Sequence, residues 1–436
     1  MDQNLGTNAK ETADTKETAF QERFKLFVGF DWASDHHDVV GVIASGEVVL
    51  EDRFEDDEKG WAGLRRKFIE LVGPDLARLA VAIETCNGPA VERLLEMGCV
   101  VYPLNPKSAQ RYRDRKSPVG GKNDRLDAWS FGDALRTDGQ GWKPLLPDDP
   151  ITQELRILCR DEVQLIQQRT GLACQLQAAL REYYPAALEA FEDWTTPSTW
   201  AFVEAFPTPA ILVKAGKRRW EKFLHVHKLY RPETYPRRLE IFARADRFAG
   251  TPAVTSAKSR LAVAMVAQLR ALQKQLELYR QAIEQLFEQH PDNDIFGSLP
   301  GAGGKLAPRM LSELGDRRER FEDAQGLQCY AGSAPVTRQS GKRKSVHFRT
   351  GCNKHLRQAL HLWANLSREK STWAAVYYQH KRDEGMSHAC ALRCLAQRWL
   401  KILWRMWQDH TTYDEAFHTR NQIEHGSWVI QPVQPA

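Results

Sequence analysis

The first third of the chain alternates short apolar runs with amphipathic segments. Three strand-like runs, at 24–34, 36–44 and 46–54, follow one another across tight polar turns. Helical spacing of apolar residues follows at 58–72, and the later segments then alternate: a strand in ARLAVAIET, a helix in GPAVERLLEMG, a strand in CVVYPLNP and a helix in DRLDAWSFGDALR. Hairpin-connected strands followed by alternating helices and strands predict a mixed α/β sheet.

Beyond the proline-containing segment LLPDDPIT the pattern becomes almost wholly helical. Two long apolar stripes, at 151–182 and 253–289, predict long helices that pair either within one chain or as a coiled coil between chains. A turn and a helix begin near Ile295, and the stripe at 388–407 has the spacing of a buried helix face. The predicted organisation is a disordered lead-in at 1–23, an α/β domain at 24–145, a helical or coiled-coil region at 146–294 with an insertion near 185–252, and a mainly α domain at 295–436.

Composition narrows the class of protein. A chain of 436 residues exceeds the size at which one core keeps growing, so two or three domains are expected. The mean hydropathy is −0.52, and no apolar run approaches the roughly 20 residues that span a bilayer. The polar N-terminal residues have no signal-peptide pattern, and the eight scattered cysteines suit reduced thiols, so we expect a cytoplasmic protein without a membrane partner. The net charge of +5 is mild, and its local distribution is more informative.

Four acidic residues carry the first candidate chemistry. Asp31 and Glu84 lie on or just past apolar strand-like runs, where an unpaired carboxylate is disfavoured by desolvation. Asp124 and Asp127 lie three residues apart on one face of a predicted helix. This order matches the RNase H-like fold, and the four carboxylates predict a Mg²⁺ site, with Mn²⁺ as a substitute. Taken alone, Asp124 and Asp127 also fit exposed helix acids that pair with neighbouring arginines.

A basic segment around Ser340 carries the second candidate chemistry. Residues 338–357 contain seven lysines and arginines and no acidic residue, a composition that suits a polyphosphate backbone. Ser340 precedes Gly341 there, either as an ordinary turn residue or as a nucleophile whose phosphate target the cations neutralise. A second basic stretch leads into Asp124. The predicted nucleic-acid contacts are Lys107, Arg111, Arg113, Lys122, Arg338, Lys342, Arg343, Lys344, Arg349, Lys354 and Arg357.

Taken jointly, five motifs resemble the IS110-family transposases, including the IS1111-type branch. They are VGFDWASDHHDVVGV, AIETCNGPAVERLLEMGCVVYPLNP, KNDRLDAWSFGDALR, LPGAGGKLAPRMLSELGDRRERF and YAGSAPVTRQSGKRKSVHFRTGCNKHLRQALHLWA. The resemblance implies a RuvC-like DEDD domain with Asp31, Glu84, Asp124 and Asp127 at a Mg²⁺ site. It also implies a C-terminal transposase domain in which Ser340 forms a covalent link to DNA. Ser333 departs from the family pattern in the AGSAP block and places a second serine near this candidate nucleophile.

The same resemblance implies partners. A structured noncoding guide RNA would pair with target and donor DNA, so that the RNA chooses the sequence and the protein supplies the chemistry. Members assemble as dimers and as dimers of dimers.

Four hypotheses follow from the sequence. The leading one is an RNA-guided DNA recombinase of a mobile insertion element. Its rivals are a RuvC-like metal-dependent nuclease or Holliday-junction resolvase, in which water attacks, and a site-specific DNA invertase without guide RNA. A non-catalytic nucleic-acid scaffold is the fourth, and the intact set of four acids argues against it.

Overall fold

The computed structural model describes residues 18–86, 88–116 and 124–428. The chain divides into two compact units, Met1–Pro147 and Asp148–Ala436, and each is described by itself. Residues 18–23, which the sequence assigns to the lead-in, are helical, and the Phe20 ring lies 5.2 Å from that of Phe24. The rest of the predicted lead-in, 1–17, lies outside the described residues.

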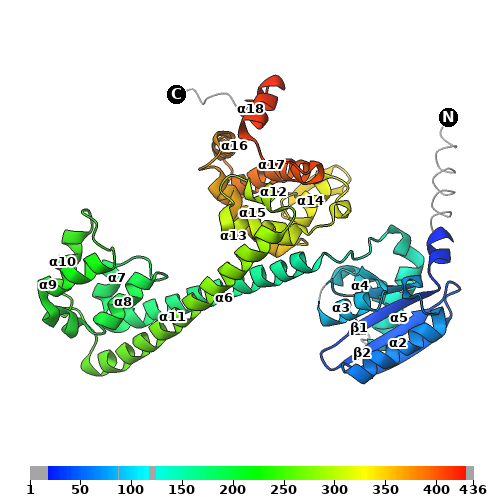
Figure 1. Ribbon diagram of the computed structural model, residues 1–436, viewed down its shortest axis with the longest axis horizontal. Helices are drawn as coiled ribbons and strands as arrows, with labels where there is room; N and C mark the ends of the chain where they lie inside the picture. The colour runs from blue at the N-terminus through cyan, green and yellow to red at the C-terminus, as the bar shows by residue number, and fades with distance from the viewer. Residues whose placement is uncertain (1–17, 87, 117–123, 429–436) are drawn as a thin grey trace. The chain divides into compact units, whose positions relative to one another are not determined.

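A five-stranded mixed sheet forms the centre of the first unit (Figure 1). In spatial order β3-β2-β1-β4-β5, the inner strands β1 and β2 pair antiparallel, as do β2 and β3, whereas β1–β4 and β4–β5 are parallel. The predicted mixed α/β sheet is confirmed, and β1 is its central strand. The strands are β1 Leu26–Trp32, β2 His36–Val42, β3 Val48–Glu55, β4 Leu79–Ile83 and β5 Val100–Pro103.

Alternate residues of the strands supply two apolar layers, one on each face of the sheet. Helices α2 (Glu58–Val72) and α3 (Pro89–Glu96) cover one face, and α4 (Pro106–Lys116) and α5 (Asp124–Asp138) cover the other. Two 3-10 turns, η1 (Leu76–Arg78) and η2 (Gly139–Gly141), complete the unit. Helix α4 was not predicted, because PKSAQRYRDRK has almost no apolar residues to show a period.

Two glycines bring α5 unusually close to the sheet. A Cβ atom added to Gly29 of β1 would lie 1.7 Å from the backbone oxygen of Ala128, and one added to Gly132 would lie 2.9 Å from the Gly29 nitrogen. Real Cβ atoms do not approach so closely, and only glycine on both elements permits this contact. The N-terminal turn of α5 is thereby held beside the end of β1.

Two long antiparallel helices form the axis of the second unit (Figure 1). Helix α6 spans Pro150–Tyr183 and α11 spans Pro252–Gln289. Arg169 of α6 hydrogen-bonds to Gln273 of α11, and Glu162 of α6 hydrogen-bonds to Arg280 of α11. The two helices therefore run in opposite directions. Of the two pairings that the sequence left open, the structure has the one within a single chain.

Residues 185–252 form a helical tip at one end of this pair. Its core is aromatic and is built around fully buried Trp194, Trp200, Phe202 and Phe242, with apolar residues from both long helices. The tip helices are α7 Pro185–Ala190, α8 Pro197–Ala205, α9 Pro209–Val226 and α10 Tyr235–Ala243.

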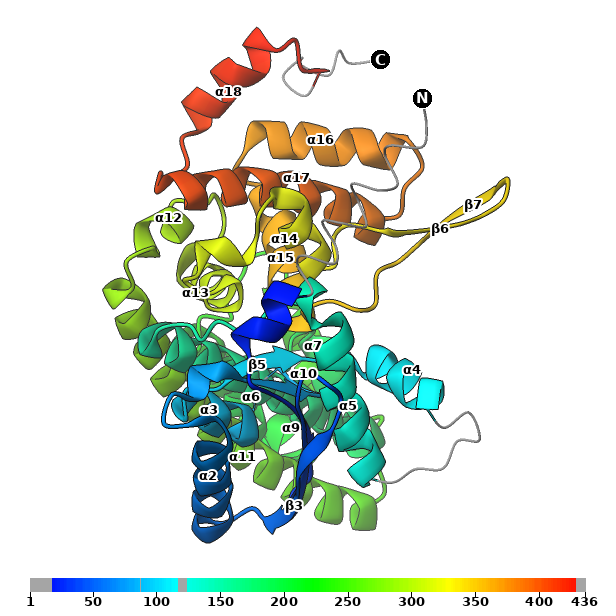
Figure 2. The same cartoon turned by 90° about the vertical axis from the view of Figure 1, so that its right-hand side faces the viewer.

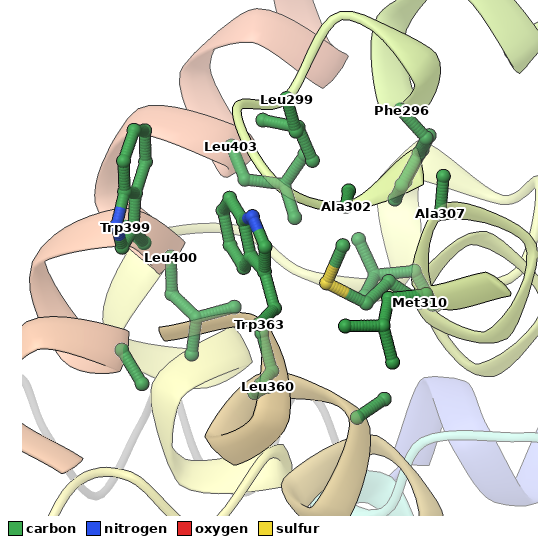
Figure 3. Packing of buried hydrophobic residues seen from close by; sticks show 14 of the residues in the cluster. Phe296, Leu299, Ala302, Ala307, Met310, Leu360, Trp363, Trp399, Leu400 and Leu403 are labelled. Atoms are coloured by element: carbon green, nitrogen blue, oxygen red, sulfur yellow. The ribbon is translucent and has the colours of Figure 1, made fainter. Parts of the chain in front are cut away.

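The other end of the pair packs into a mainly helical C-terminal part. Trp363, Trp399 and Leu403 lie in its core (Figure 3), so the predicted reading of the stripe at 388–407 as a buried face is confirmed. Its elements are α12 Asn293–Gly297, α13 Gly303–Leu314, η3 Arg318–Arg320, α14 Ala324–Tyr330, β6 Val336–Ser340, β7 Arg343–His347, α15 Lys354–Ser367, α16 Thr372–Asp383, α17 His388–Asp409 and α18 Glu415–Glu424. None of the helices in the described ranges combines the length and apolar character that a membrane crossing requires.

Candidate functional site

The pairing of β1 with its two neighbouring strands places three acidic side chains, those of Asp31, Asp38 and Glu84. Asp31 lies near the end of β1, not at its centre, and is directly opposite Asp38 of β2, so both side chains leave the same face of the sheet. On the other side of β1, Phe30 pairs with Ile83 of β4, which sets Glu84 beside Asp31 as the next step of the parallel register. This is the face that α5 covers.

The charges of these residues converge on Asp31. Burial raises the pKa of Asp31 to about 7, with further contributions from the carboxylates of Asp127, Asp124, Glu84 and Asp38. Like charges that must lie together in a partly buried place disfavour ionisation. The structure thus brings all four sequence-predicted acids into one electrostatic cluster, which also includes Asp38.

Asp127 is the most deeply buried acid of the predicted set, with 2% of its surface exposed. Its Oδ2 accepts a hydrogen bond from Nη1 of Arg113, a residue of α4, at 2.7 Å. Its Oδ1 has no hydrogen-bond partner among the described residues. A buried carboxylate oxygen without a donor is costly, unless a cation binds it. Arg113, predicted as a nucleic-acid contact, acts here as a counter-ion to Asp127.

Asp124 is held by Arg53, an arginine that the sequence analysis missed. Arg53 lies on β3 and forms two-pronged hydrogen bonds with Asp38, and its Nη2 also donates to Asp124 Oδ2 at 3.2 Å. Ligand atoms of His36, Asp38 and Asp124 lie within 4.8 Å of one another. The SDHHD motif contains the two additional residues, His36 and Asp38, but their approach to Asp124 becomes visible only when α5 is placed on the sheet.

The donor set fits a divalent metal ion. Carboxylate oxygens are the ligands that hard cations such as Mg²⁺ prefer, and the cluster offers several of them on one face of the sheet. The raised pKa of Asp31 and the orphaned oxygen of Asp127 are both relieved by an added positive charge. Among the described residues, those whose ligand atoms lie close enough together are His36, Asp38 and Asp124, whereas Asp31, Glu84 and Asp127 are linked to this group through the electrostatics of Asp31. The assignment of the ion to Asp31, Glu84, Asp124 and Asp127 stays a prediction.

Ser340 lies at the end of an exposed two-stranded hairpin in the second unit (Figure 2). Gly341 follows it with a φ of 54°, a left-handed conformation that glycine adopts without a Cβ penalty, so β6 returns as β7 through a two-residue turn. Ser340 is paired with Arg343 and Arg338 with Ser345, which places Ser340 and both arginines on one face of the hairpin. The hydroxyl is exposed between cations.

The remaining predicted nucleic-acid contacts lie on α4, on the hairpin, at the hairpin base and on α15. Lys107 and Arg111 lie exposed on α4, and Lys342 and Lys344 lie exposed on the hairpin. At the hairpin base, the guanidinium of Arg349 donates to the backbone oxygen of Ala334 at 3.0 Å and so joins the segment before β6 to the segment after β7. Lys354 and Arg357 belong to the first turn of α15. The predicted contact Lys122 lies outside the described residues.

Two further serines lie near the hairpin. Ser333 precedes β6, and its hydroxyl donates to the backbone oxygen of Gln328 at 3.3 Å. The Ser345 hydroxyl shares a hydrogen bond of 2.9 Å with His347, two residues further along the same face. Sequence analysis did not single out the Ser345–His347 pair, which depends on the strand geometry of β7.

Comparisons with known proteins agree with both halves of the chain. The family model of the IS110-type DEDD domain, described as a transposase, matches residues 28–185, and the model described as the transposase IS116/IS110/IS902 family matches residues 293–379. The transposase assigned to the IS117 mini-circle of Streptomyces coelicolor is 35% identical over 91% of this chain and 97% of its own length. A 43.6 kDa protein of insertion element IS110 from the same species is 28% identical, over 89% of this chain and 95% of its own length. A 42 kDa protein of insertion element IS900 from Mycobacterium paratuberculosis is 31% identical, over 69% and 74%.

Proposed function

Because the chain belongs to the IS110 family of transposases, whose substrate is DNA, we propose that it cuts and rejoins DNA strands through a Ser340 nucleophile and a Mg²⁺-binding carboxylate site. The observation that carries the proposal is the position of Ser340. Its hydroxyl is exposed at the tip of a hairpin, with Arg338 and Arg343 on the same face. A scissile phosphate bound there meets a nucleophile and two charges that stabilise the transition state.

In this proposal, strand transfer takes place in two steps through Ser340. Ser340 Oγ attacks phosphorus, a serine–phosphate bond forms, and the bond from phosphorus to one sugar oxygen breaks. The proton of the serine hydroxyl passes through solvent to the departing sugar oxygen, which leaves as a hydroxyl. In the second step, a hydroxyl of another DNA end attacks the same phosphorus and releases Ser340.

The carboxylate cluster supplies the metal part of the proposal. Asp31, Glu84, Asp124 and Asp127 would hold Mg²⁺, or Mn²⁺ in its place, and the ion would polarise the phosphate. Arg113 donates a hydrogen bond to Asp127 and Arg53 donates one to Asp124, so each of these carboxylates has one cationic partner. The raised pKa of Asp31 supports the proposal, because burial and, after it, the neighbouring carboxylates disfavour its negative charge, and a bound cation would favour that charge.

Partners complete the proposed function. The family resemblance supports a structured guide RNA that selects target and donor DNA, and assembly of the protein as dimers and dimers of dimers. The exposed cations of α4 and of the β6–β7 hairpin suit nucleic-acid backbones. The direct check is whether a discrete RNA copurifies with the protein from its native host, and whether ribonuclease treatment abolishes strand transfer.

The nucleophile is tested by trapping the covalent protein–DNA adduct on a denaturing gel. Ser340→Ala is expected to abolish the adduct. Ser345→Ala removes a hydroxyl from the same face of the same hairpin, and Ser333→Ala removes the neighbouring serine, so both are matched controls that should retain it. An adduct that survives Ser340→Ala and disappears in Ser333→Ala would assign the chemistry to Ser333.

The second candidate function is a metal-dependent nuclease in which activated water attacks the phosphate. The buried Asp127 oxygen and the carboxylate cluster favour it, since they make a metal site without reference to Ser340. In that case DNA would be cut at wild-type rate by Ser340→Ala, no adduct would form, and Asp31→Asn alone would stop cleavage.

A further inference from the structure

A cavity of about 540 Å³ lies at the base of the β6–β7 hairpin. The segment 331–333, before β6, and Phe348, directly after β7, line it, and α15 and α17 contribute the rest of its wall. Small-molecule sites have volumes of about 300–1,000 Å³, so the cavity is large enough for a nucleotide-sized ligand. Neither the carboxylate cluster nor the Ser340 hydroxyl belongs to it.

The charged side chains that line the cavity are all cationic. Lys354 and Arg357 come from α15 and Arg393 from α17, and there is no carboxylate among the lining residues. Its floor is apolar and includes the buried side chain of Leu360, which is also part of the core in Figure 3. Such a lining suits a ligand with one anionic part and one flat apolar part.

An aromatic platform stands at the cavity. Phe348 is 49% exposed, and the guanidinium carbons of Arg357 and Arg393 lie over its ring at 5.0 and 5.1 Å from the centroid. Nucleobases that leave the helical stack bind on aromatic rings and on guanidinium planes of this kind, while the same arginines reach the phosphate. An exposed phenylalanine flanked by two arginines is therefore a suitable platform for an unstacked base.

A histidine adds hydrogen-bonding capacity to the wall. Burial, together with the charges of His388 and Arg393, lowers the pKa of His361 below its usual range. The imidazole is neutral at pH 7 and presents one donor and one acceptor nitrogen, which suits the polar edge of a base.

From this geometry we propose that the cavity receives one unstacked nucleotide of the DNA strand whose phosphate Ser340 attacks. The inference rests on the proposed function and adds a second contact point on the same strand. The five residues of β6 place Ser340 about 13 Å from the hairpin base at ~3.3 Å per residue. This length corresponds to about four nucleotides of a stacked strand at ~3.4 Å each.

The test measures binding of a fluorescein-labelled single-stranded DNA oligonucleotide to the full-length protein in the Ser340→Ala background, which separates binding from chemistry. Phe348→Ala is expected to weaken binding about 5- to 150-fold, the range that stacking of one base supplies. Phe348→Trp should retain the affinity. Phe417→Ala, which removes another exposed phenylalanine, from α18, is the matched control and should bind like the parent.

Unchanged affinity in Phe348→Ala, or the same loss in Phe417→Ala, overturns the proposal. So does an oligonucleotide series in which RNA binds through Phe348 and DNA does not. In the trapped adduct of the wild-type protein, 2-aminopurine fluorescence should increase when the probe stands about four nucleotides from the linked phosphate, because stacking on neighbouring bases quenches the probe and withdrawal from the stack relieves this quenching. An increase next to that phosphate instead would overturn the proposal.

The two proposals fail separately. If Ser340→Ala abolishes the adduct while Phe348→Ala binds DNA normally, only the nucleotide pocket is wrong. If the adduct survives Ser340→Ala while Phe348→Ala loses DNA affinity, the nucleophile is wrong and the cavity still binds a nucleotide.

Discussion

Gly29 of β1 and Ala128 of α5 approach so closely that a Cβ on the glycine would lie 1.7 Å from the alanine carbonyl oxygen. Ala128 directly follows Asp127, and Gly29 lies two residues before Asp31 on the same face of the strand. The contact therefore sets the separation of the strand carboxylates from the helix carboxylates.

Gly29→Ala is expected to displace α5 from the sheet and weaken divalent-metal binding. Overpacking of a core costs about 1–3 kcal/mol, and a backbone clash places this variant at or above the upper end. Mn²⁺ titration should show lower affinity, and hydrogen exchange should rise in β1 and α5. Gly63→Ala in α2 is the control, because its added Cβ meets no atom within 4 Å. Normal Mn²⁺ affinity in Gly29→Ala would mean that the helix–sheet distance does not govern the carboxylate cluster.

Asp31→Asn is expected to change how stability depends on pH. Burial and the neighbouring carboxylates raise the pKa of Asp31 to about 7 in the folded chain, against about 3.9 in an unfolded one. The native state then holds more protons between these values, so the free energy of unfolding falls as the pH rises through this window. In EDTA, the variant should lack this fall and be more stable than wild type at pH 8 and equal to it near pH 4.

Thermal unfolding of the N-terminal unit across this pH range checks the Asp31 prediction. Glu96→Gln, an exposed carboxylate change on α3, should leave the wild-type pH dependence in place. Added Mg²⁺ should stabilise the wild-type protein at pH 8 but not Asp31→Asn. A variant that is less stable than wild type at pH 8 would contradict the repulsion inferred among these acids.

Glu162 joins three helices of the second unit, and its loss should be costly. This carboxylate of α6 is 2% exposed and accepts hydrogen bonds from Arg280 of α11 at 2.9 Å and Arg309 of α13 at 2.7 Å. Removing it leaves two partly buried cations unpaired, and such a loss costs about 3–5 kcal/mol. Glu162→Ala should lower the urea midpoint of the second unit, and exposed Glu154→Ala on the same helix should not. Equal midpoints would show that the ion pairs of Glu162 add nothing measurable to the stability of the three-helix junction.

Ser367→Ala is expected to loosen the tryptophan core. The indole N–H of Trp399 donates to the Ser367 hydroxyl at 2.9 Å in a fully buried place. An unsatisfied buried donor costs about 1–3 kcal/mol. Denaturant unfolding followed by near-UV circular dichroism should report this loss, whereas Ser256→Ala on the exposed face of α11 should be neutral. A stability change below the error of the measurement would indicate that the indole finds another acceptor.

The sheet was predictable because its strands are short apolar runs, and apolar side chains gain free energy when they are buried in a core. The same reasoning found Asp31 and Glu84, whose charges interrupt that period. It could not find the roles of Asp38 and Arg53, because their approach to Asp124 depends on which residues of β1, β2 and β3 face one another. Sequence alone does not state the register.

The hairpin around Ser340 was missed for a different reason. Segments VTRQS and RKSVH are polar on both faces and largely exposed, so they show no alternation of apolar and polar residues. Their pairing depends on the two-residue turn at Gly341 and on the fastening of Arg349 to Ala334. The nucleotide-sized cavity combines the hairpin base with α17, a helix some forty residues further along the chain, and no local pattern contains it.

The antiparallel pair of α6 and α11 separates the helical tip from the C-terminal part of the second unit, so its length sets how far the tip reaches. The tip at 185–252 has its own aromatic core, distinct from the core that supports the serine hairpin. Insertion or deletion of matched helical turns in both helices would move the tip by about 5.4 Å per turn and leave the hairpin where it is. Mobile elements could thus diverge in the reach of this arm while their cutting chemistry stays constant.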